Sequence, residues 1–521
     1  GCFAIGSRRG VSGHQHNPFA MLAESGAGEE HGAIYGMALM YSGNFILEAQ
    51  QDQYSQTRVQ MGVSDERFDF LLDCGEHFFT PEVIMAFSDS GFGRLSHIFH
   101  RFIRNNVCRE PYKLSRRPIL VNNWEATYFD FTGAKLVEIA AEAAKLGIEM
   151  FVLDDGWFGE RGPDDRGLGD WYVNTGKLGG ELKDTVDKIN ALGLKFGLWI
   201  EPEMVNENSA LYRAHPDWAM TIPGKPPVLG RSQLVLDFTR ADVRTAIYDM
   251  ICAVIDSANV EYIKMDMNRS ICEAYSALAE RQNFGELCYK YVLGVYDFIE
   301  RLRTRYPDML IEGCSSGGAR FDAGMMYYTP QIWTSDNTDA IERLRIQYGA
   351  SFGYPISVVG SHVSAVPNHQ NGRITDIDTR AAVAMSGNFG YELDLTKLSD
   401  EDKDKIRRQI EAFKADWELI HNGLYYRVTD WPDKSGYMAW NSVSPDGAHA
   451  LLTAVTTDSS GTDYGNPVVI YVRCKGLDAH ARYVCRETGM TLSGSELMFI
   501  GIPLPAAGEY TAFRFHFDKE A

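Results

Sequence analysis

Residues 118–157 read PILVNNWEATYFDFTGAKLVEIAAEAAKLGIEMFVLDDGW. Two apolar runs, PILVNNW (118–124) and EMFVLDDGW (149–157), flank a segment with helical periodicity that ends at Gly147. The apolar positions of that segment recur every three or four residues: Leu136, Ile139, Ala143 and Leu146. A buried strand, an amphipathic helix closed by glycine and a second buried strand predict a βαβ unit with parallel strands.

The same unit repeats along the chain. A second helical face consists of Leu182, Val186, Ile189 and Leu192, stops at Gly193 and is followed by KFGLWIEPE (195–203). Further strand candidates are QLVLDF (233–238), EYIKMD (261–266), MLIEGC (309–314), QIWTSD (331–336) and PISVVG (355–360), with helical segments near 241–258, 284–305 and 338–350. Eight strands alternating with helices predict a parallel (β/α)₈ barrel over residues 118–420.

The flanking regions have a different pattern. Residues 1–90 contain alternating apolar and polar runs, which predict part of an N-terminal antiparallel β-sandwich, and residues 91–117 connect it to the barrel. Residues 421–521 return to short strands (MAWNSV, AHALLTAV, VVIYVRC, YTAFRFHF) and predict a C-terminal β-sandwich. Because the chain starts at Gly1 inside a β region, we expect a preceding segment.

Composition narrows the class of partner. The 521 residues carry a formal net charge of −20, with 45% hydrophobic and 23% charged residues, as in soluble globular proteins. An acidic chain disfavours nucleic acid and anionic membranes, and no apolar stretch is long enough to span a membrane. Nine scattered cysteines without paired spacing favour a reducing compartment, the cytoplasm. A small neutral ligand fits this composition best.

The predicted strands end in acids and aromatic residues. These strand-end residues are Trp124, Asp154, Asp155, Trp157, Trp199, Glu201, Glu203, Asp237, Asp266, Cys314 and Asp336. Barrel active sites lie at the carboxyl ends of the strands, so we expect these side chains to surround one pocket. Indoles stack on sugar rings, carboxylates accept hydroxyl protons, and a carboxylate pair can cleave a glycosidic bond. The pattern predicts a carbohydrate enzyme that uses neither a metal nor another cofactor.

Several longer segments resemble the α-galactosidases of glycoside hydrolase family 36. They are SGHQHNPF, NNWEATYFDF, FVLDDGWFG, GLWIEPEM, YIKMDMNR, CSSGGARFD, IWTSDNTDAIERLRIQYG and SHVSAVPNHQ. They occur in the family's order over essentially the whole chain. The resemblance implies a member of the family that lacks roughly the first part of the N-terminal domain.

The resemblance also implies roles for individual residues. Asp266 would be the nucleophile and Asp336 the acid/base of a retaining hydrolase. Galactose would be bound by Asp154 and Asp155 at O4 and O6 with help from Lys264 and Trp199, by Arg231, by Asn268, Cys314 and Gly317 near O2, and by Trp124 as part of the wall. The implied substrates are melibiose and raffinose-type oligosaccharides, and the family implies a homo-oligomer, often a tetramer.

Each candidate also has a structural interpretation. Asp266 could be an ion pair with Lys264 or Arg269, Asp154 and Asp155 could cap a helix, the two tryptophans could be core, and Cys314 could be an inert buried thiol. His14 and His16 are expected to be loop histidines rather than metal ligands, and an approach of His362 to the site after the last strand is the less favoured interpretation of that residue.

Three functional alternatives stay open. They are an α-N-acetylgalactosaminidase, an α-galactosyl transglycosylase and a carbohydrate-binding protein on an inactive barrel. Two local departures bear on the first, because many family members have tryptophan at the position of Met265 and more glycines across 313–319. Both departures concern the space around O2 and the acceptor side.

Overall fold

The central element is a closed parallel barrel, seen in a computed structural model that describes residues 1–430, 436–458, 469–505 and 508–520. Its strands are β7 (Leu120–Asn122), β8 (Met150–Leu153), β9 (Lys195–Ile200), β12 (Tyr262–Met265), β13 (Leu310–Gly313), β14 (Gln331–Trp333), β15 (Val359–Ser364) and β16 (Asn388–Glu392). They pair in chain order, and β16 closes the ring on β7. The predicted (β/α)₈ fold is confirmed.

One predicted barrel strand was wrong. QLVLDF (233–238) contributes only β11 (Leu234–Val235), which pairs antiparallel with β10 (Met204–Val205) outside the barrel. Asp237 therefore follows a strand outside the barrel; its Oδ1 accepts hydrogen bonds from the nearby Thr239. The eighth barrel strand is β16, sequence NFGYE, which the apolar pattern did not predict.

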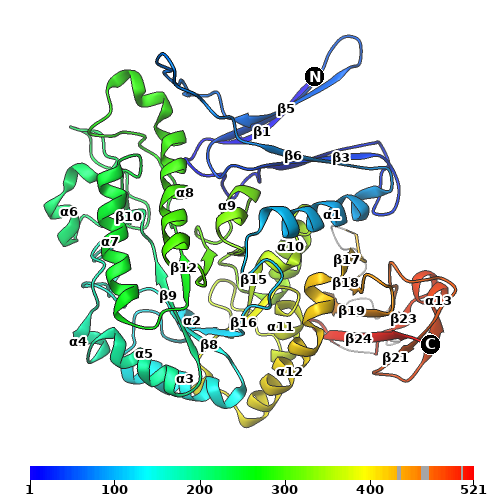
Figure 1. The fold of residues 1–521 in the computed structure, drawn as a ribbon. Coiled ribbons are helices and arrows are strands. Elements are labelled where there is room, and N and C mark those ends of the chain that lie inside the picture. Colours follow the sequence, from blue (N-terminus) through cyan, green and yellow to red (C-terminus); the bar gives the residue numbers. More distant parts are fainter. Residues whose placement is uncertain (431–435, 459–468, 506–507, 521) are drawn as a thin grey trace.

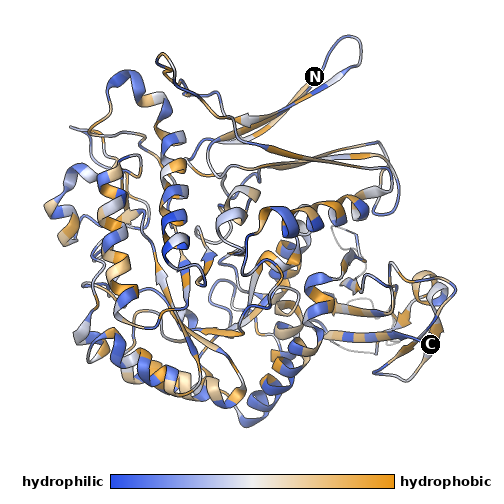
Figure 2. Ribbon diagram, in the orientation of Figure 1, coloured by the Kyte–Doolittle hydropathy of each residue, from blue (hydrophilic) through white to orange (hydrophobic). Residues whose placement is uncertain are grey.

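Helices surround the barrel, as Figure 1 shows. The longer ones are α3 (Gly133–Leu146), α5 (Leu182–Ala191), α7 (Ala241–Ser257), α8 (Leu287–Arg305), α10 (Ala340–Ala350), α11 (Ile377–Ala384) and α12 (Asp400–Asn422). Shorter ones are α2 (Trp124–Thr127), α4 (Thr175–Leu178), α6 (Ala210–Ala214) and α9 (Ala323–Tyr328). Figure 2 shows polar and apolar residues alternating along α8 and α12, as in amphipathic helices.

Helix α3 forms as its sequence predicts. The Thr132 hydroxyl caps its first turn by accepting from the Lys135 amide, and Gly147 ends it with φ 89°, a conformation that glycine adopts without strain. Its four predicted apolar residues are all buried. In α5, Leu182, Val186 and Ile189 are buried as predicted, whereas Leu192 lies past the helix end and is 38% exposed.

The barrel strands are held by ladders of unequal length. Strand β12 has four paired residues with β9 and four with β13. Strand β14 has two with β13 and two with β15. Backbone hydrogen bonds therefore hold β12 more firmly than β14.

Antiparallel sheets lie before and after the barrel in the chain. The N-terminal region contains two three-stranded sheets, one of β1 (Cys2–Ser7), β4 (Phe45–Gln51) and β5 (Thr57–Val63), the other of β2 (Phe19–Ala23), β3 (Ile34–Leu39) and β6 (Val83–Ser88). Helix α1 (Gly91–Phe102) packs against β3 and β6 (Figure 1). It leads from the N-terminal sheets toward the barrel.

The C-terminal region contains a six-stranded sheet. Its strands, in spatial order, are β17 (Leu424–Arg427), β18 (Tyr437–Val443), β19 (His449–Thr456), β24 (Ala512–Lys519), β21 (Arg482–Cys485) and β22 (Thr491–Ser493). A second pair consists of β20 (Tyr471–Val472) and β23 (Ile502–Pro503), with α13 (Gly494–Phe499) between β22 and β23. The first residue of the predicted strand VVIYVRC, 468, lies outside the described residues.

No helix in the described part of the chain combines the length and the apolar character needed to cross a bilayer. All nine cysteines are free thiols in the structure.

The buried face of α3 supports a first prediction. Ile139 is completely buried, so Ile139→Ala should lower the free energy of unfolding of the barrel by about 2–5 kcal/mol through a cavity in the core. The exposed neighbour Glu138 is the control, and Glu138→Ala should change it by less than about 0.5 kcal/mol. Urea unfolding followed by tryptophan fluorescence measures both, and equal effects would contradict this packing.

Candidate active site

A polar cavity of about 220 Å³ lies at the carboxyl ends of the barrel strands. Nine of the residues predicted for the site line it: Trp124, Asp154, Asp155, Trp199, Arg231, Lys264, Asp266, Asn268 and Asp336. Cys314 and Gly317, the other two, lie outside this lining set and against its wall. Of the strand-end acids and indoles, six line the cavity, whereas the expectation was wrong for Trp157, Glu201, Glu203 and Asp237, which do not line it.

Asp266 follows β12 and accepts hydrogen bonds on both carboxylate oxygens. Its Oδ2 accepts from the Asn268 amide at 2.8 Å and the Trp199 indole at 3.2 Å. Its Oδ1 accepts from the backbone amides of Met267 at 2.8 Å and Ser316 at 3.2 Å. Four donors fix the carboxylate plane and favour its charged form.

The charge around Asp266 acts in the same direction. Burial by itself raises the pKa of a carboxyl, but the Lys264 ammonium and donors that include Cys314 and Asn268 hold the pKa of Asp266 below its usual value. Lys264 is not paired with Asp266 directly: its Nζ lies 2.9 Å from Asp154 Oδ2. The ion-pair interpretation of Asp266 is therefore replaced by a through-space effect of Lys264.

Asp336 follows β14 and has an environment of the opposite kind. Its Oδ1 accepts a hydrogen bond from the Trp333 indole at 3.2 Å. Burial and the negative charge of Asp266 raise the pKa of Asp336 to about 6. Two carboxyls facing one cavity are thus kept in different protonation states in weakly acidic solution, the arrangement expected of a base or nucleophile beside an acid.

Asp154 and Asp155 make separate ion pairs. Asp154 Oδ2 accepts from Lys264 and, at 2.6 Å, from Asn122. Asp155 is bound by the buried Arg161, whose Nη2 lies 2.8 Å from Oδ2. Burial raises the pKa of Asp155, and Arg161 opposes this. Neither aspartate caps a helix, because the next helix, α4, is capped by Asn174.

The two tryptophans lie at different depths. Trp199 is 2% exposed, donates its indole N–H to Asp266 and stacks on Phe158 with ring centroids 6.1 Å apart. Trp124 is half-buried and makes edge contacts with Tyr128 and Phe129. Both indoles therefore pack on other aromatic rings and also line the cavity.

Arg231 and Asn268 contribute polar groups from loops. Arg231 precedes β11, has φ 50°, and places Nη2 3.8 Å from Asp164 Oδ1. Asn268 donates its backbone amide to the buried Glu201, which also accepts from Gln233 at 3.1 Å. Burial and the nearby Asp266 raise the pKa of Glu201 to about 8. A neutral Glu201 therefore adds no further negative charge beside Asp266.

Cys314 and Gly317 do not line the cavity but lie next to the two aspartates, Cys314 beside Asp266 and Gly317 beside the backbone of Asp336. Cys314 is buried behind Asp266, and burial raises the pKa of its thiol. Gly317 has φ 80°, and a Cβ there would lie 2.7 Å from the Asp336 backbone nitrogen. A side chain at 317 would displace the segment that carries Asp336.

Six further lining residues were not predicted from the sequence as site residues: Glu125, Trp333, Thr338, His369, Gln370 and Glu392. Glu392 ends the missed strand β16, and His362 Nδ1 lies 3.1 Å from it. His362 also packs on Trp333, with ring centroids 4.5 Å apart. His369 and Gln370 lie in the segment SHVSAVPNHQ, whose resemblance to the family could have identified them as site residues. Glu392 could have been identified as a strand-end acid only if NFGYE had been predicted as a barrel strand.

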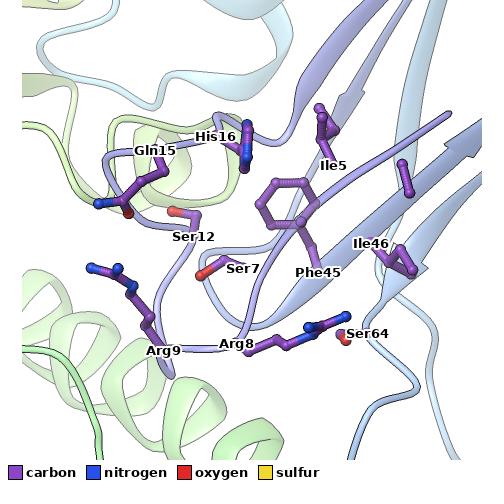
Figure 3. A pocket seen from close by; sticks show the side chains of 12 residues that line it. Ile5, Ser7, Arg8, Arg9, Ser12, Gln15, His16, Phe45, Ile46 and Ser64 are labelled. Carbon is purple, nitrogen blue, oxygen red and sulfur yellow. The ribbon is translucent and has the colours of Figure 1, made fainter.

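A larger cavity lies beside the N-terminal strands and is shown in Figure 3. It measures about 380 Å³, and the described residues lining it include Arg8, Arg9 and His16 but no carboxylate. It cannot supply a pair of acids. Among the described residues, no three His, Cys, Asp or Glu side chains are grouped to hold a metal ion.

A parallel barrel with an ionised and a protonatable carboxyl facing one polar cavity defines a glycoside hydrolase. Three family models match the chain: the glycosyl hydrolase family 36 N-terminal domain over residues 1–73, Melibiase over 77–423 and the family 36 C-terminal domain over 437–517. The chain belongs to glycoside hydrolase family 36.

Relatives named as α-galactosidases match over nearly the whole chain. The bifunctional α-galactosidase/sucrose kinase AgaSK of Mediterraneibacter gnavus is 53% identical over 520 residues, which are 100% of this chain and 54% of that protein. The α-galactosidase AgaA of Geobacillus stearothermophilus is 48% identical over 97% of this chain and 68% of its own length. The chain thus spans about half of the first relative and two thirds of the second.

Solved structures of α-galactosidases have the same fold as this chain. The galactosidase domain of AgaSK superposes with a TM-score of 0.96 at 52% identity, covering 100% of this chain and 71% of that chain. A variant of AgaA in complex with raffinose superposes with a TM-score of 0.97 at 45% identity, covering 100% of this chain and 72% of that chain.

The two carboxyls should titrate as a coupled pair. Because the charge of Asp266 raises the pKa of Asp336 to about 6, Asp266→Asn should lower that pKa toward the ordinary carboxyl range, and Asp336→Asn should remove the titration near pH 6. Infrared difference titration of the carboxyl C=O band measures this. The exposed Asp165→Asn is the control. An unchanged titration in Asp266→Asn would contradict the coupling.

Proposed function

We propose that this chain is a retaining α-galactosidase that hydrolyses terminal α-D-galactose from oligosaccharides of the melibiose, raffinose and stachyose type. The observation that carries the proposal is the opposite environment of Asp266 and Asp336 at one cavity. Family membership and the relatives crystallised with raffinose and stachyose support the substrate class.

In the first step, Asp266 attacks the anomeric carbon while Asp336 gives its proton to the glycosidic oxygen, and the bond to the leaving sugar breaks. In the second step, Asp336 takes a proton from water, which attacks the anomeric carbon and releases Asp266. Two inversions return galactose with the α configuration. The donors around Asp266 suit a charged nucleophile, and the raised pKa of Asp336 suits an acid.

The closed end of the cavity would bind galactose. We assign O4 and O6 to Asp154 and Asp155, assisted by Lys264 and Trp199, because these charged groups are buried and already oriented by ion pairs. Arg231 and Trp124 complete the wall. Asn268 faces O2 directly, whereas Cys314 and Gly317 act on O2 from behind the lining, through the loop they shape.

The leaving sugar would lie on the side of Asp336. Gln370 donates its side-chain amide to the Asp336 carbonyl at 2.8 Å. Thr338 and His369 both contact Glu125, at 2.7 and 3.2 Å, and Glu125 is itself a buried residue of the cavity lining. These polar groups can bind sugar hydroxyls near the proton donor.

We also propose the wider setting of the protein. The domain limits are 1–90, 91–117, 118–420 and 421–521, the compartment is the cytoplasm, and the assembly is a homo-oligomer. Nine free thiols support a reducing compartment. The resemblance to the family supports an oligomer.

Substrates with different leaving groups distinguish the proposed roles of Asp266 and Asp336. Asp266→Ala should abolish hydrolysis of every α-galactoside, because no nucleophile remains to form the glycosyl intermediate. Asp336→Ala should lose at least ~10²-fold on melibiose but much less on a dinitrophenyl galactoside, whose leaving group needs no proton. Steady-state kinetics measures both, with Asp165→Asn as the control.

A fluorinated galactosyl fluoride should label Asp266, and peptide mass spectrometry locates the adduct. An adduct on another residue, or β-galactose as the first product by NMR, would rule out this assignment of roles.

Space around O2 separates galactose from N-acetylgalactosamine. Asn268 lines the cavity and the buried Cys314 lies behind the lining, and with both close to O2 we expect an acetamido group to cost about 1–3 kcal/mol in overpacking. Aryl α-galactoside should therefore exceed aryl α-N-acetylgalactosaminide by at least ~10-fold in kcat/KM. Equal rates would favour the N-acetylgalactosaminidase alternative, and predominant transfer to added sugar would favour the transglycosylase. Binding of galactose without turnover would favour a binding protein.

A further inference from the structure

The loop Cys314–Ala319 contacts the carboxyl group of Asp266 and the backbone next to Asp336. The backbone amide of Ser316 donates to Asp266 Oδ1 at 3.2 Å. Its neighbour Gly317 packs so closely on the segment before Asp336 that a Cβ would lie 2.8 Å from Ser335 Cα. The conformation of this loop therefore determines whether Asp266 receives the Ser316 hydrogen bond, and it limits where the backbone of Asp336 can lie.

The loop has an unfavourable backbone conformation at its tip. Ser316 has φ 49° and Gly317 has φ 80°, so two consecutive residues adopt the left-handed conformation. Glycine tolerates it, but for serine it persists only where surrounding contacts hold the chain. The loop needs support from outside.

The support comes from the N-terminal segment Ser12–Asn17, about three hundred residues earlier in the chain. His14 Nε2 donates to the Ser316 carbonyl at 2.8 Å. The Gly13 amide donates to the Ala319 carbonyl at 2.7 Å, and the Asn17 side chain donates to the Phe321 carbonyl at 2.6 Å. Each contact holds a backbone carbonyl of the loop or of the turn that follows it.

The supporting segment is itself fixed. The Ser12 amide donates to the Ser42 carbonyl at 2.8 Å, and the Ser12 and Ser42 hydroxyls lie 2.6 and 2.7 Å from the buried carboxyl of Asp322. Figure 3 shows Ser12, Gln15 and His16 on this segment, between the N-terminal strands and the barrel. The segment therefore transmits the position of the N-terminal sheet to the barrel loop.

We propose that His14 is a positioning residue of the active site, which acts through the Ser316 backbone on Asp266. By holding the Ser316 carbonyl, His14 fixes the peptide group that follows Ser316, and this limits rotation at Ser316 so that the preceding peptide group keeps its N–H pointed at Asp266. This proposal rests on the function proposed above, because its effect on rate requires Asp266 to act as nucleophile.

The test compares three variants of the intact chain. His14→Ala should lower kcat by about 3- to 10-fold, as expected for one lost hydrogen bond, with KM within about 2-fold. The loss should be equal on melibiose and on a dinitrophenyl galactoside, because the lost hydrogen bond orients the donor to Asp266, whereas Gly317 keeps its own packing against the backbone next to Asp336. The acidic limb of the pH profile should move to higher pH, since Asp266 loses an oriented donor. His14→Gln should restore most of kcat, because the glutamine amide can donate in place of Nε2.

His16→Ala is the matched control, since His16 is exposed like His14 and belongs to the same segment but lines the other cavity. It should leave kcat and the pH profile unchanged. A His14→Ala enzyme that behaves like His16→Ala, or a His14→Gln enzyme as impaired as His14→Ala, would overturn the proposal.

Amide hydrogen exchange tests the contact between His14 and the loop independently of the proposed enzymatic activity. The peptide covering 314–321 should exchange faster in His14→Ala than in the parent or in His16→Ala. An inactive parent would refute the α-galactosidase assignment, and exchange would still test the contact between His14 and the loop. Faster exchange with unchanged kcat in an active enzyme would refute the positioning role.

Discussion

The charge balance around Lys264 constrains the whole site. Its ammonium is buried beside Asp154, and its charge lowers the pKa values of Asp266 and Glu392. Without a buried cation, a cavity lined by this many carboxyls would bind protons and lose its negative charge. Lys264 lies on β12 and Asp266 directly follows the last residue of that strand, so cation and carboxylate enter the cavity from neighbouring positions of one chain segment.

Asp266 and Asp336 depend on each other through charge. Burial and the charge of Asp266 raise the pKa of Asp336 to about 6, and burial and the same charge raise the pKa of Glu201 to about 8, which disfavours a third charge beside them. Each group is thus tuned mainly by burial and by its neighbours' protonation. A structural change that exposed the cavity to water would weaken all of these effects together, because solvent screens charges.

The sequence predicted much of the fold because helix periodicity and buried strands leave strong local signals. It failed where the signal was weak. QLVLDF is apolar enough for a barrel strand but pairs with Met204–Val205 outside the barrel, whereas NFGYE, a real barrel strand, has a glycine and few apolar residues. The predicted number of eight barrel strands was therefore correct although QLVLDF was wrongly included and NFGYE was missed.

The same reasoning applies to the site. Residues at strand ends could be predicted from barrel geometry, and nine of the predicted site residues line one cavity. The support that His14 gives to Ser316 could not be predicted, because this contact joins residues 302 positions apart that no sequence spacing relates. Loops that fold back over a barrel rim are decided by tertiary packing.

The unequal ladders of the barrel distribute stiffness between the two carboxyls. Asp266 extends from β12, which is paired over four residues on each side, and Asp336 follows β14, which is paired over two. A nucleophile must meet one carbon atom in both steps, whereas an acid/base must follow a sugar oxygen and then a water oxygen. With the roles proposed above, the barrel attaches the nucleophile to the strand with the longer ladders and the acid/base to the strand with the shorter ones.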